Sequence, residues 1–313
     1  MRRKGERQVT RSDRVKALLI PLARAYIRYF PIVAGKRSFW NRLVNPYLAW
    51  HSYKFQTSTI FGSRMSGDTQ DILQQYIYYF GVWESNLTHF ITRRLAPGDT
   101  FIDVGANIGY FSLLASKIVG EAGRVVAIEA SPRIFSALRS NINRNQTRNI
   151  RVVNMAVSHR KGFLKLYSGT EFNSGLTTTR EERGLEFECE IEARPLDAIL
   201  SKSELEAARF IKIDVEGAEW DVVAGMGRLL RSGRSDLEVM VEVSPELLAS
   251  QGKCPEDLVR IFSEAGFYAY TLENDYSPLS YLVPFTAKRP TRLCGPLQGV
   301  SDIVFSLQNS EHI

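Results

Sequence analysis

The chain has 313 residues, of which 44% are hydrophobic and 24% are charged, a composition typical of a globular protein that can bury a full core. Its charge is uneven. The chain has 40 basic and 34 acidic residues, and residues 1–42 contain 12 of the basic residues but only 2 of the acidic ones. The remainder has 28 basic and 32 acidic residues. The main body is therefore not expected to bind nucleic acid, and any surface that attracts anions is expected in the N-terminal segment.

The three cysteines, Cys189, Cys254 and Cys294, are far apart and form no C-x-x-C pair, and no histidine lies near them at metal-ligand spacing. This pattern predicts neither a disulfide framework nor a zinc site. A reducing, cytoplasmic location is expected.

The N-terminal segment is basic and contains one apolar run, Ala17–Ala23, which includes Pro21 and is followed by Arg24. A signal peptide needs roughly 7–15 uninterrupted apolar residues, and a membrane-spanning helix needs about 20. We therefore predict neither for this chain.

The same segment has the spacing of an amphipathic helix. Its apolar positions are Val15, Leu18, Leu19, Leu22, Tyr26 and Tyr29, and Arg14, Arg24 and Arg28 fall on another side. A basic amphipathic helix can lie on an anionic membrane, here through residues 1–45, or its stripe can pack on the rest of the protein as a lid or dimer contact. We predict a basic amphipathic extension over residues 1–53, a main domain over residues 54–313, and a location that is cytoplasmic or membrane-peripheral.

Alternating residues between Lys54 and Asp71 predict an antiparallel ribbon, and Ser85–Arg94 is predicted as a helix that ends before Pro97-Gly98. The pattern then becomes regular. The predicted elements are strand Thr100–Val104, helix Gly109–Val119, strand Arg124–Glu129, helix Arg133–Asn143 and strand Ile150–Asn154. This β-α-β-α-β order implies a parallel sheet with right-handed crossovers.

Two strands, Gly162–Ser168 and Phe187–Ala193, are predicted as an insertion around a polar loop at residues 169–184. Parallel order resumes with strand Phe210–Asp214, a helix from Ala218, strand Leu237–Val243 and helix Pro255–Ala265. The last two β runs, Phe267–Leu272 and Ile303–Leu307, have no helix between them, which implies a hairpin and an antiparallel last strand. The predicted fold is α/β, a Rossmann-like sheet that is mostly parallel.

A glycine loop, Asp103-Val104-Gly105-Ala106-Asn107-Ile108-Gly109, joins the first strand of this sheet to its helix. Glycine lets the backbone approach a ligand closely, and Asp103 can accept hydrogen bonds from an amino group or loop amides. Glu129 ends the second strand, where an acid can bind ribose hydroxyls. The pattern predicts a nucleoside-containing cofactor.

The spacing within this loop favours S-adenosylmethionine over NAD. A G-x-G-x-x-G loop leaves room for a pyrophosphate, whereas Ala106 and Asn107 follow Gly105 here. The Asn107 amide can bind the carboxylate of an amino acid, which S-adenosylmethionine carries. A methyltransferase is therefore favoured over an NAD(P)-dependent oxidoreductase, for which the catalytic Tyr-x-x-x-Lys is missing, and over a non-catalytic adenosyl-binding protein.

Several motifs together resemble the FkbM family of S-adenosylmethionine-dependent methyltransferases. They are Gly81-Val82-Trp83-Glu84, Pro97-Gly98-Asp99, Asp103–Tyr110, Glu129-Ala130-Ser131-Pro132, Asn154-Met155-Ala156 and Ile211–Glu219. The resemblance runs from about Phe55 to Leu307. It implies methylation of a hydroxyl on a glycan, a lipid-linked sugar or a secondary metabolite.

The resemblance also implies where the cofactor binds. Asp103, Gly105, Asn107 and Gly109 would hold the methionine part, Glu129 the ribose, and Ala156 would line the adenine pocket. The neighbours Ala106, Ala130 and Ser131 are included in the predicted cofactor site.

Acidic residues follow the later strands. Asp214 and Glu216 come at the end of the fourth strand and Glu242 at the end of the fifth, so all three are expected at the carboxyl edge of the sheet. A carboxylate there can take the proton of an acceptor hydroxyl, and these three are the predicted catalytic residues. The next acid, Glu219, is expected mainly to complement a helix dipole.

The same three acids could hold a divalent cation through oxygen ligands, but no Asp-x-Asp or histidine ligand run accompanies them, so no metal site is predicted. Substrate contacts are predicted at Glu84, Asn173 and Ser174. For the last two, the alternative is a turn in which they bond only to the backbone. His159, in a basic loop, is expected at the surface.

Overall fold

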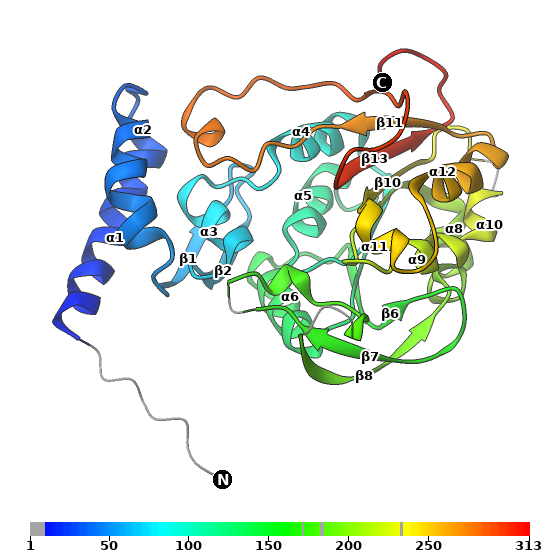
Figure 1. Cartoon of the computed structure of the whole chain (residues 1–313), viewed down its shortest axis with the longest axis horizontal. Coiled ribbons are helices and arrows are strands. Elements are labelled where there is room, and N and C mark those ends of the chain that lie inside the picture. Colours follow the sequence, from blue (N-terminus) through cyan, green and yellow to red (C-terminus); the bar gives the residue numbers. More distant parts are fainter. Residues whose placement is uncertain (1–9, 171, 182–184, 232–233) are drawn as a thin grey trace, which may run out of the picture. The chain divides into compact units, whose positions relative to one another are not determined.

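The computed structural model describes residues 10–313 except 171, 182–184 and 232–233, and it leaves the side chain of Ser174 undescribed. The chain forms two compact units (Figure 1). The N-terminal unit comprises the residues up to Trp83 together with Tyr276–Phe285, and the sheet unit comprises Glu84–Asp275 and Thr286–Ile313. Residues 54–83 therefore lie with the N-terminal segment, whereas the sequence-based division assigned them to the main domain.

The described elements of the N-terminal unit are α1 (Arg11–Tyr29), α2 (Lys36–Phe39), the π-helix η1 (Trp40–Ala49), β1 (Lys54–Ser58), β2 (Arg64–Asp68), α3 (Ile72–Tyr79) and the 3-10 turn η4 (Ser280–Leu282). Strands β1 and β2 pair antiparallel, which confirms the predicted ribbon. None of the described helices is both long enough and apolar enough to cross a bilayer.

An aromatic core holds the N-terminal unit together and explains its extent. The Trp40 ring lies edge-on to Tyr79, with centroids 5.5 Å apart, and Tyr76 lies edge-on to Tyr281 at 4.9 Å. Each such pair contributes about 0.5–1.5 kcal/mol beyond the area it buries. Because these rings come from η1, α3 and η4, residues 54–83 and 276–285 pack with the N-terminal helices.

The described helices of the sheet unit are α4 (Ser85–Arg94), α5 (Tyr110–Val119), α6 (Pro132–Asn145), η2 (Ser174–Leu176), α7 (Leu196–Ile199), α8 (Lys202–Ala207), α9 (Glu219–Ala224), α10 (Gly227–Leu230), α11 (Pro245–Ala249) and α12 (Pro255–Glu264). Its described strands are β3 (Thr100–Val104), β4 (Arg124–Glu129), β5 (Ile150–Asn154), β6 (Ala156–Val157), β7 (Gly162–Ser168), β8 (Glu186–Arg194), β9 (Ala208–Ile213), β10 (Glu238–Val243), β11 (Tyr268–Leu272), β12 (Thr291–Arg292) and β13 (Ser301–Ser306).

The main sheet has the strand order β12-β11-β13-β10-β9-β3-β4-β5. Strands β5, β4, β3, β9 and β10 pair parallel, while β13 runs antiparallel to both β10 and β11. The predicted antiparallel last strand is confirmed. After β3 the chain adds β4 and β5 on one side of that strand, and it later adds β9 and β10 on the other side. The strand order therefore reverses between β3 and β9, and an open α/β sheet binds its ligand at such a switch point.

The predicted hairpin at the end of the sheet differs in detail. Strands β11 and β13 do pair, but residues 273–300 connect them through η4 and β12, and part of that connection belongs to the N-terminal unit. The predicted insertion is a separate small sheet of order β6-β8-β7, in which β7 and β8 pair antiparallel.

Alternate residues of the main sheet face two different layers. Ile102, Ile211 and Val241 belong to the core that includes residues of α9, α10 and α12. On the opposite face Phe210 contacts Phe90 of α4, and Lys212 lies over the Phe111 ring of α5. Because side chains two residues apart share a face, charged residues in step with Lys212 point toward the α4 and α5 layer.

Candidate active site

The loop between β3 and α5 is shaped by backbone that only glycine adopts easily. Gly105 has φ +81°, and a Cβ at this position would overlap the carbonyl oxygen of Asp214. Gly109 has φ +92° and caps the N-terminus of α5. The loop therefore lies directly against the end of β9, with no room for a side chain at Gly105.

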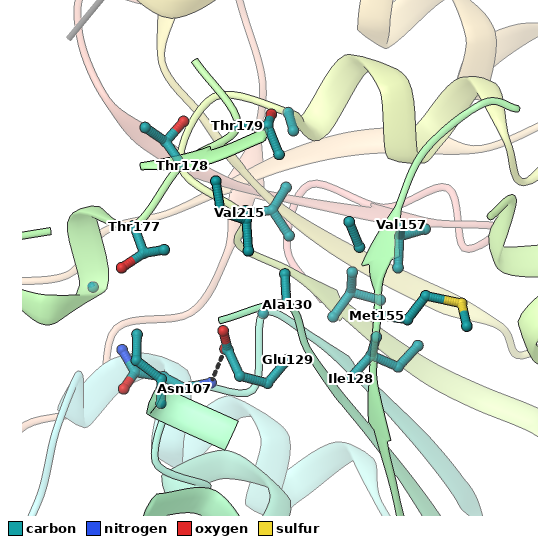
Figure 2. Close-up of a pocket in the computed structure, with 17 residues that line it drawn as sticks. Asn107, Ile128, Glu129, Ala130, Met155, Val157, Thr177, Thr178, Thr179 and Val215 are labelled. Carbon is teal, nitrogen blue, oxygen red and sulfur yellow. Dashed lines mark hydrogen bonds between the residues drawn. The ribbon is translucent and has the colours of Figure 1, made fainter. Parts of the chain in front are cut away.

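Two polar residues brace this loop. Asn107 has φ +49°, and its Oδ1 accepts a hydrogen bond from the Ile108 backbone N–H at 2.8 Å. The Glu129 carboxylate accepts from the backbone N–H groups of Asn107 and Ser131, each at 2.9 Å, and Figure 2 shows the first of these bonds. Glu129 thus ties the end of β4 to the loop, and burial raises the pKa of its carboxyl group to about 7.

A pocket opens beside the loop at the switch point of the sheet (Figure 2). Five predicted cofactor residues line it, namely Gly105, Asn107, Glu129, Ala130 and Ala156. Its other walls come from Ile134 of α6, Met155, the threonines 177–179 and Val215. The pocket combines apolar walls with a carboxylate and an amide, the composition expected of a nucleoside site.

The other four predicted cofactor residues, Asp103, Ala106, Gly109 and Ser131, lie outside the pocket lining. Ser131 caps α6 by accepting from the Ile134 N–H, and it donates to Glu188 of β8 at 2.6 Å. Asp103 is buried and accepts a hydrogen bond at Oδ2 from Ser112 of α5. These two side chains support the loop and its neighbouring helices.

The residues of this region fit S-adenosylmethionine. Among the described residues, none donates a hydrogen bond to Asp103 Oδ1, although this atom is buried. The Gly105 backbone is open to the pocket, and the Asn107 amide and Glu129 carboxylate lie on its wall. An orphaned acceptor, a side-chain-free loop and a strand-end acid together suit a ligand with an amino acid end and a ribose.

The segment that follows β7 forms part of the pocket wall. Thr178 is buried, exchanges backbone hydrogen bonds with Tyr167, and donates through Oγ1 to the carbonyl oxygen of Glu216 at 2.7 Å. The insertion thereby contacts both the cofactor pocket and the loop after β9. Asn173 lies in the same segment and is half-buried. Its backbone N–H donates to Thr170, as expected for the turn that was the alternative to a substrate contact.

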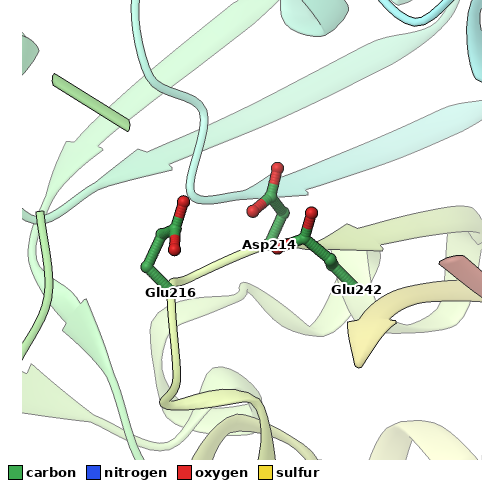
Figure 3. A group of neighbouring side chains, drawn as sticks. All are labelled: Asp214, Glu216 and Glu242. Carbon is green, nitrogen blue, oxygen red and sulfur yellow. The ribbon is translucent and has the colours of Figure 1, made fainter. Parts of the chain in front are cut away.

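Three predicted catalytic acids, Asp214, Glu216 and Glu242, come together at the carboxyl edge of the sheet (Figure 3). Each offers one carboxylate oxygen within 4.8 Å of the others, and all three side chains are partly exposed. Val215, between two of them, lines the cofactor pocket. The acid cluster is therefore adjacent in the chain to the place where the cofactor is expected.

Strand register explains why these acids meet. Lys212 of β9 is paired with Asp103 of β3 and with Met240 of β10, so Asp214 and Glu242, each two residues further on, face the same α4 and α5 layer. Lys212 Nζ donates to Asp214 Oδ2 at 2.8 Å. Burial disfavours the Lys212 ammonium, but Asp214 and Asp103 outweigh that effect and raise its pKa.

Asp302, at the start of β13, joins the cluster although it was not predicted. It is buried, its strand position is opposite Glu242, and Asn274 donates to its Oδ2. Because β13 is antiparallel, its first residues lie at the edge where the parallel strands end. The predicted direction of this strand was the signal that could have identified Asp302.

The crowding of carboxylates changes how they bind protons. The charge of Asp214 is the largest cause that raises the pKa of Glu242 well above its ordinary value, followed by burial and Asp302. Burial, followed by Asp214, raises the pKa of Asp302 to about 7. A carboxyl group tuned in this way is suited to accept a proton near neutral pH.

We expect Asp302→Asn to stabilise the protein more at pH 8 than at pH 5. The pKa of Asp302 in the folded protein, about 7, lies above its ordinary value of 3.8. The wild type therefore loses stability relative to the variant as the pH rises from the lower of these two values to the higher. Asparagine can still accept from Asn274. Urea unfolding at both pH values should show the advantage of the variant growing by about 2 kcal/mol, and an equal difference at both would contradict the assignment.

Backbone strain marks the same region. Four non-glycine residues among the described part of the chain have positive φ: Glu84, Asn107, Gln146 and Glu216. Three of these are predicted site residues. Such conformations cost of order 1–3 kcal/mol and persist where the surrounding structure enforces them, often at functional sites.

The remaining predicted residues have varied surroundings. Glu84 is buried, and its charge contributes to the raised pKa values of Lys212 and Glu242, which places it at the same edge. The side chain of Ser174 lies outside the described residues. The Glu219 carboxylate accepts from the Gly217 N–H at 3.0 Å, so this buried acid braces the turn and its helix start.

The strand order, the antiparallel strand β13 between β10 and β11, and the pocket at the switch point define the class I methyltransferase fold. Residues 103–268 match the model of the methyltransferase FkbM domain. The chain belongs to this family of S-adenosylmethionine-dependent methyltransferases, and the match sets aside the oxidoreductase interpretation.

Relatives are similar over parts of the chain. Methyltransferase sdnD of Sordaria araneosa is 27% identical over 160 residues, which cover 42% of this chain and 61% of the relative. Arsenite methyltransferase of Halobacterium salinarum is 34% identical over 56 residues, or 18% of this chain and 14% of the relative. The chain thus spans between 14 and 61% of the length of the curated relatives it matches.

Among solved structures, methyltransferase FkbM from Methylobacillus flagellatus is similar, with 16% identity and a TM-score of 0.43. The similarity covers 68% of this chain and 44% of that one.

Proposed function

We propose that this chain methylates a hydroxyl oxygen, on a sugar or glycan, a lipid-linked saccharide or a secondary metabolite. The observation that carries the proposal is the cluster of Asp214, Glu216 and Glu242 at the sheet edge that also forms the cofactor pocket. Sugar and aliphatic hydroxyls are weak nucleophiles, so their methylation benefits from a carboxylate that removes the proton.

S-adenosylmethionine, when bound, supplies an electrophilic methyl group on its sulfonium sulfur. In our proposal, Glu242 accepts the proton of the acceptor hydroxyl as the new bond to oxygen forms. Asp214 is held in place by Lys212 and keeps the pKa of Glu242 high. General base catalysis of this kind contributes typically 10²–10⁴-fold in rate, and holding the acceptor oxygen in line with the methyl group contributes several kcal/mol more.

The test compares glycans and metabolites from cells that lack the gene with those from complemented cells. We expect one compound to lose the mass of a single methylene group in the deletion strain. The purified chain should restore that mass with labelled S-adenosylmethionine, and NMR should place the label on oxygen. A label on carbon or nitrogen would overturn the assignment of the acceptor atom.

We expect the activity to survive removal of divalent cations. The three carboxylates lie close enough to hold an ion, but Lys212 already provides a positive charge at Asp214. Methyl transfer should be equal before and after dialysis against EDTA. A loss of about tenfold or more that Mg²⁺ restores would show instead that the cluster is a metal site.

A further inference from the structure

Helix α1 has two apolar faces, and only one of them is buried. Ile20, Ala23 and Ile27 pack into the core of the N-terminal unit with Trp40 and Val44. The stripe predicted from the sequence lies on another side of the helix and is largely exposed, with Leu18 72% and Leu22 66% accessible. We call the exposed residues Val15, Leu18, Leu19, Leu22 and Tyr29 the outer face of α1.

The exposed apolar surface continues beyond the helix. Phe30, Ile32 and Val33, which follow α1 directly, are also exposed. Single exposed apolar side chains are ordinary, but a contiguous run on one helix and its extension is typical of a surface that binds a partner or a membrane.

The contacts that hold the helix in place come mainly from residues outside its outer face, although Arg24 also donates to the Tyr29 hydroxyl. Thr10 and Asp13 form a capping box at its start. Arg24 donates to the Tyr78 carbonyl and to Thr57 Oγ1, at 2.9 and 2.6 Å, and Arg28 donates to the Ser58 carbonyl at 2.5 Å. These contacts fix the orientation of the helix, so the outer face remains presented to the surroundings.

The charge around this face indicates what it binds. Residues 1–42 contain 12 basic and two acidic residues, and on α1 itself Arg11 and Arg14 are exposed beside the outer face. One of the two acids, Asp13, is engaged in the capping box. A second copy of the chain would bring the same positive charge to the contact, whereas anionic lipid would neutralise it.

We propose that the outer face of α1 docks the protein on an anionic lipid bilayer. Leu18, Leu22 and their neighbours would enter the boundary between headgroups and acyl chains, and Arg11 and Arg14 would contact anionic headgroups. Such helices lie in the plane of the interface with their apolar side about 5–10 Å deep. Basic residues near the surface add electrostatic attraction to anionic lipid.

The test is flotation of the full chain with vesicles of phosphatidylcholine, with and without phosphatidylserine. We expect binding to the anionic vesicles only, and at least a tenfold lower bound fraction for Leu18→Gln/Leu22→Gln. Because both leucines are exposed, this variant should unfold at the wild-type temperature. Phe163→Gln removes an equally exposed side chain, 73% accessible, from β7 of the sheet unit and should float like the wild type.

A second variant tests the charge. Arg11→Gln/Arg14→Gln should weaken flotation and reduce its dependence on salt. Equal binding of wild type and the leucine variant would overturn the proposal, as would equal binding to neutral and anionic vesicles. If the wild type does not float but sediments as a dimer that the leucine variant dissociates, the outer face is a subunit contact.

Discussion

Replacement of Gly105 by alanine is expected to abolish detectable binding of S-adenosylmethionine. A Cβ at this position would overlap the Asp214 carbonyl oxygen, and both groups belong to backbone that hydrogen bonds hold at the sheet edge. The overlap can be relieved only by moving the loop or the end of β9. We expect titration calorimetry to show a loss of affinity of about 100-fold or more, and 100-fold is equivalent to about 2.7 kcal/mol of binding free energy.

A matched control separates this overlap from the cost of positive φ. Gly98 has φ +93°, close to the +81° of Gly105, but a Cβ there would meet no atom within 4 Å. Gly98→Ala should therefore lose about 1–2 kcal/mol of stability and keep its cofactor affinity. If Gly105→Ala binds as tightly as Gly98→Ala, the loop does not depend on its approach to Asp214.

Replacement of Asp214 by asparagine is expected to lower turnover by about 10²-fold while cofactor affinity changes little. It should also move the pH profile. Glu242 must be ionised to accept a proton, so the rate rises as pH passes through its pKa. The charge of Asp214 is the main cause that raises this pKa, so its removal should shift the acidic limb of kcat to lower pH.

Two comparisons make this prediction specific. Glu242→Gln should lose a similar or larger factor in turnover and lose the acidic limb itself. Asp221 of α9 carries a partly exposed carboxylate that pairs with His159, and Asp221→Asn should leave the pH profile of kcat unchanged. Loss of cofactor binding in Asp214→Asn would move that residue into the cofactor site, and an unshifted limb would exclude Glu242 as the base.

The strands of the main sheet were predictable because short apolar runs bounded by glycine, proline and polar residues have few possible secondary structures other than a buried strand. Thr100–Val104, Arg124–Glu129 and Ile150–Asn154 have the predicted bounds. The acids that follow β9 and β10 were predictable for the same reason, since parallel strands end at one edge. Local pattern and chain direction were sufficient for these features.

The buried face of α1 was not predictable. The sequence places apolar residues on two sides of this helix, and for the more regular stripe it left open both packing on the protein and binding to a membrane. In the structure the shorter set, Ile20, Ala23 and Ile27, is buried because Arg24 and Arg28 bond to the β1 and α3 backbone and orient the helix. The choice depends on tertiary partners more than 25 residues away, which helical periodicity does not report.

The position of β13 affects the order in which the site can form during synthesis. This strand lies between β10 and β11, so β10 has an unpaired edge until residues 301–306 have left the ribosome (Figure 1). The cofactor loop is made about 190 residues earlier, and Asp214 and Glu216 nearly 90 residues earlier. The residues of the cofactor pocket are therefore all made before Asp302 takes its place opposite Glu242.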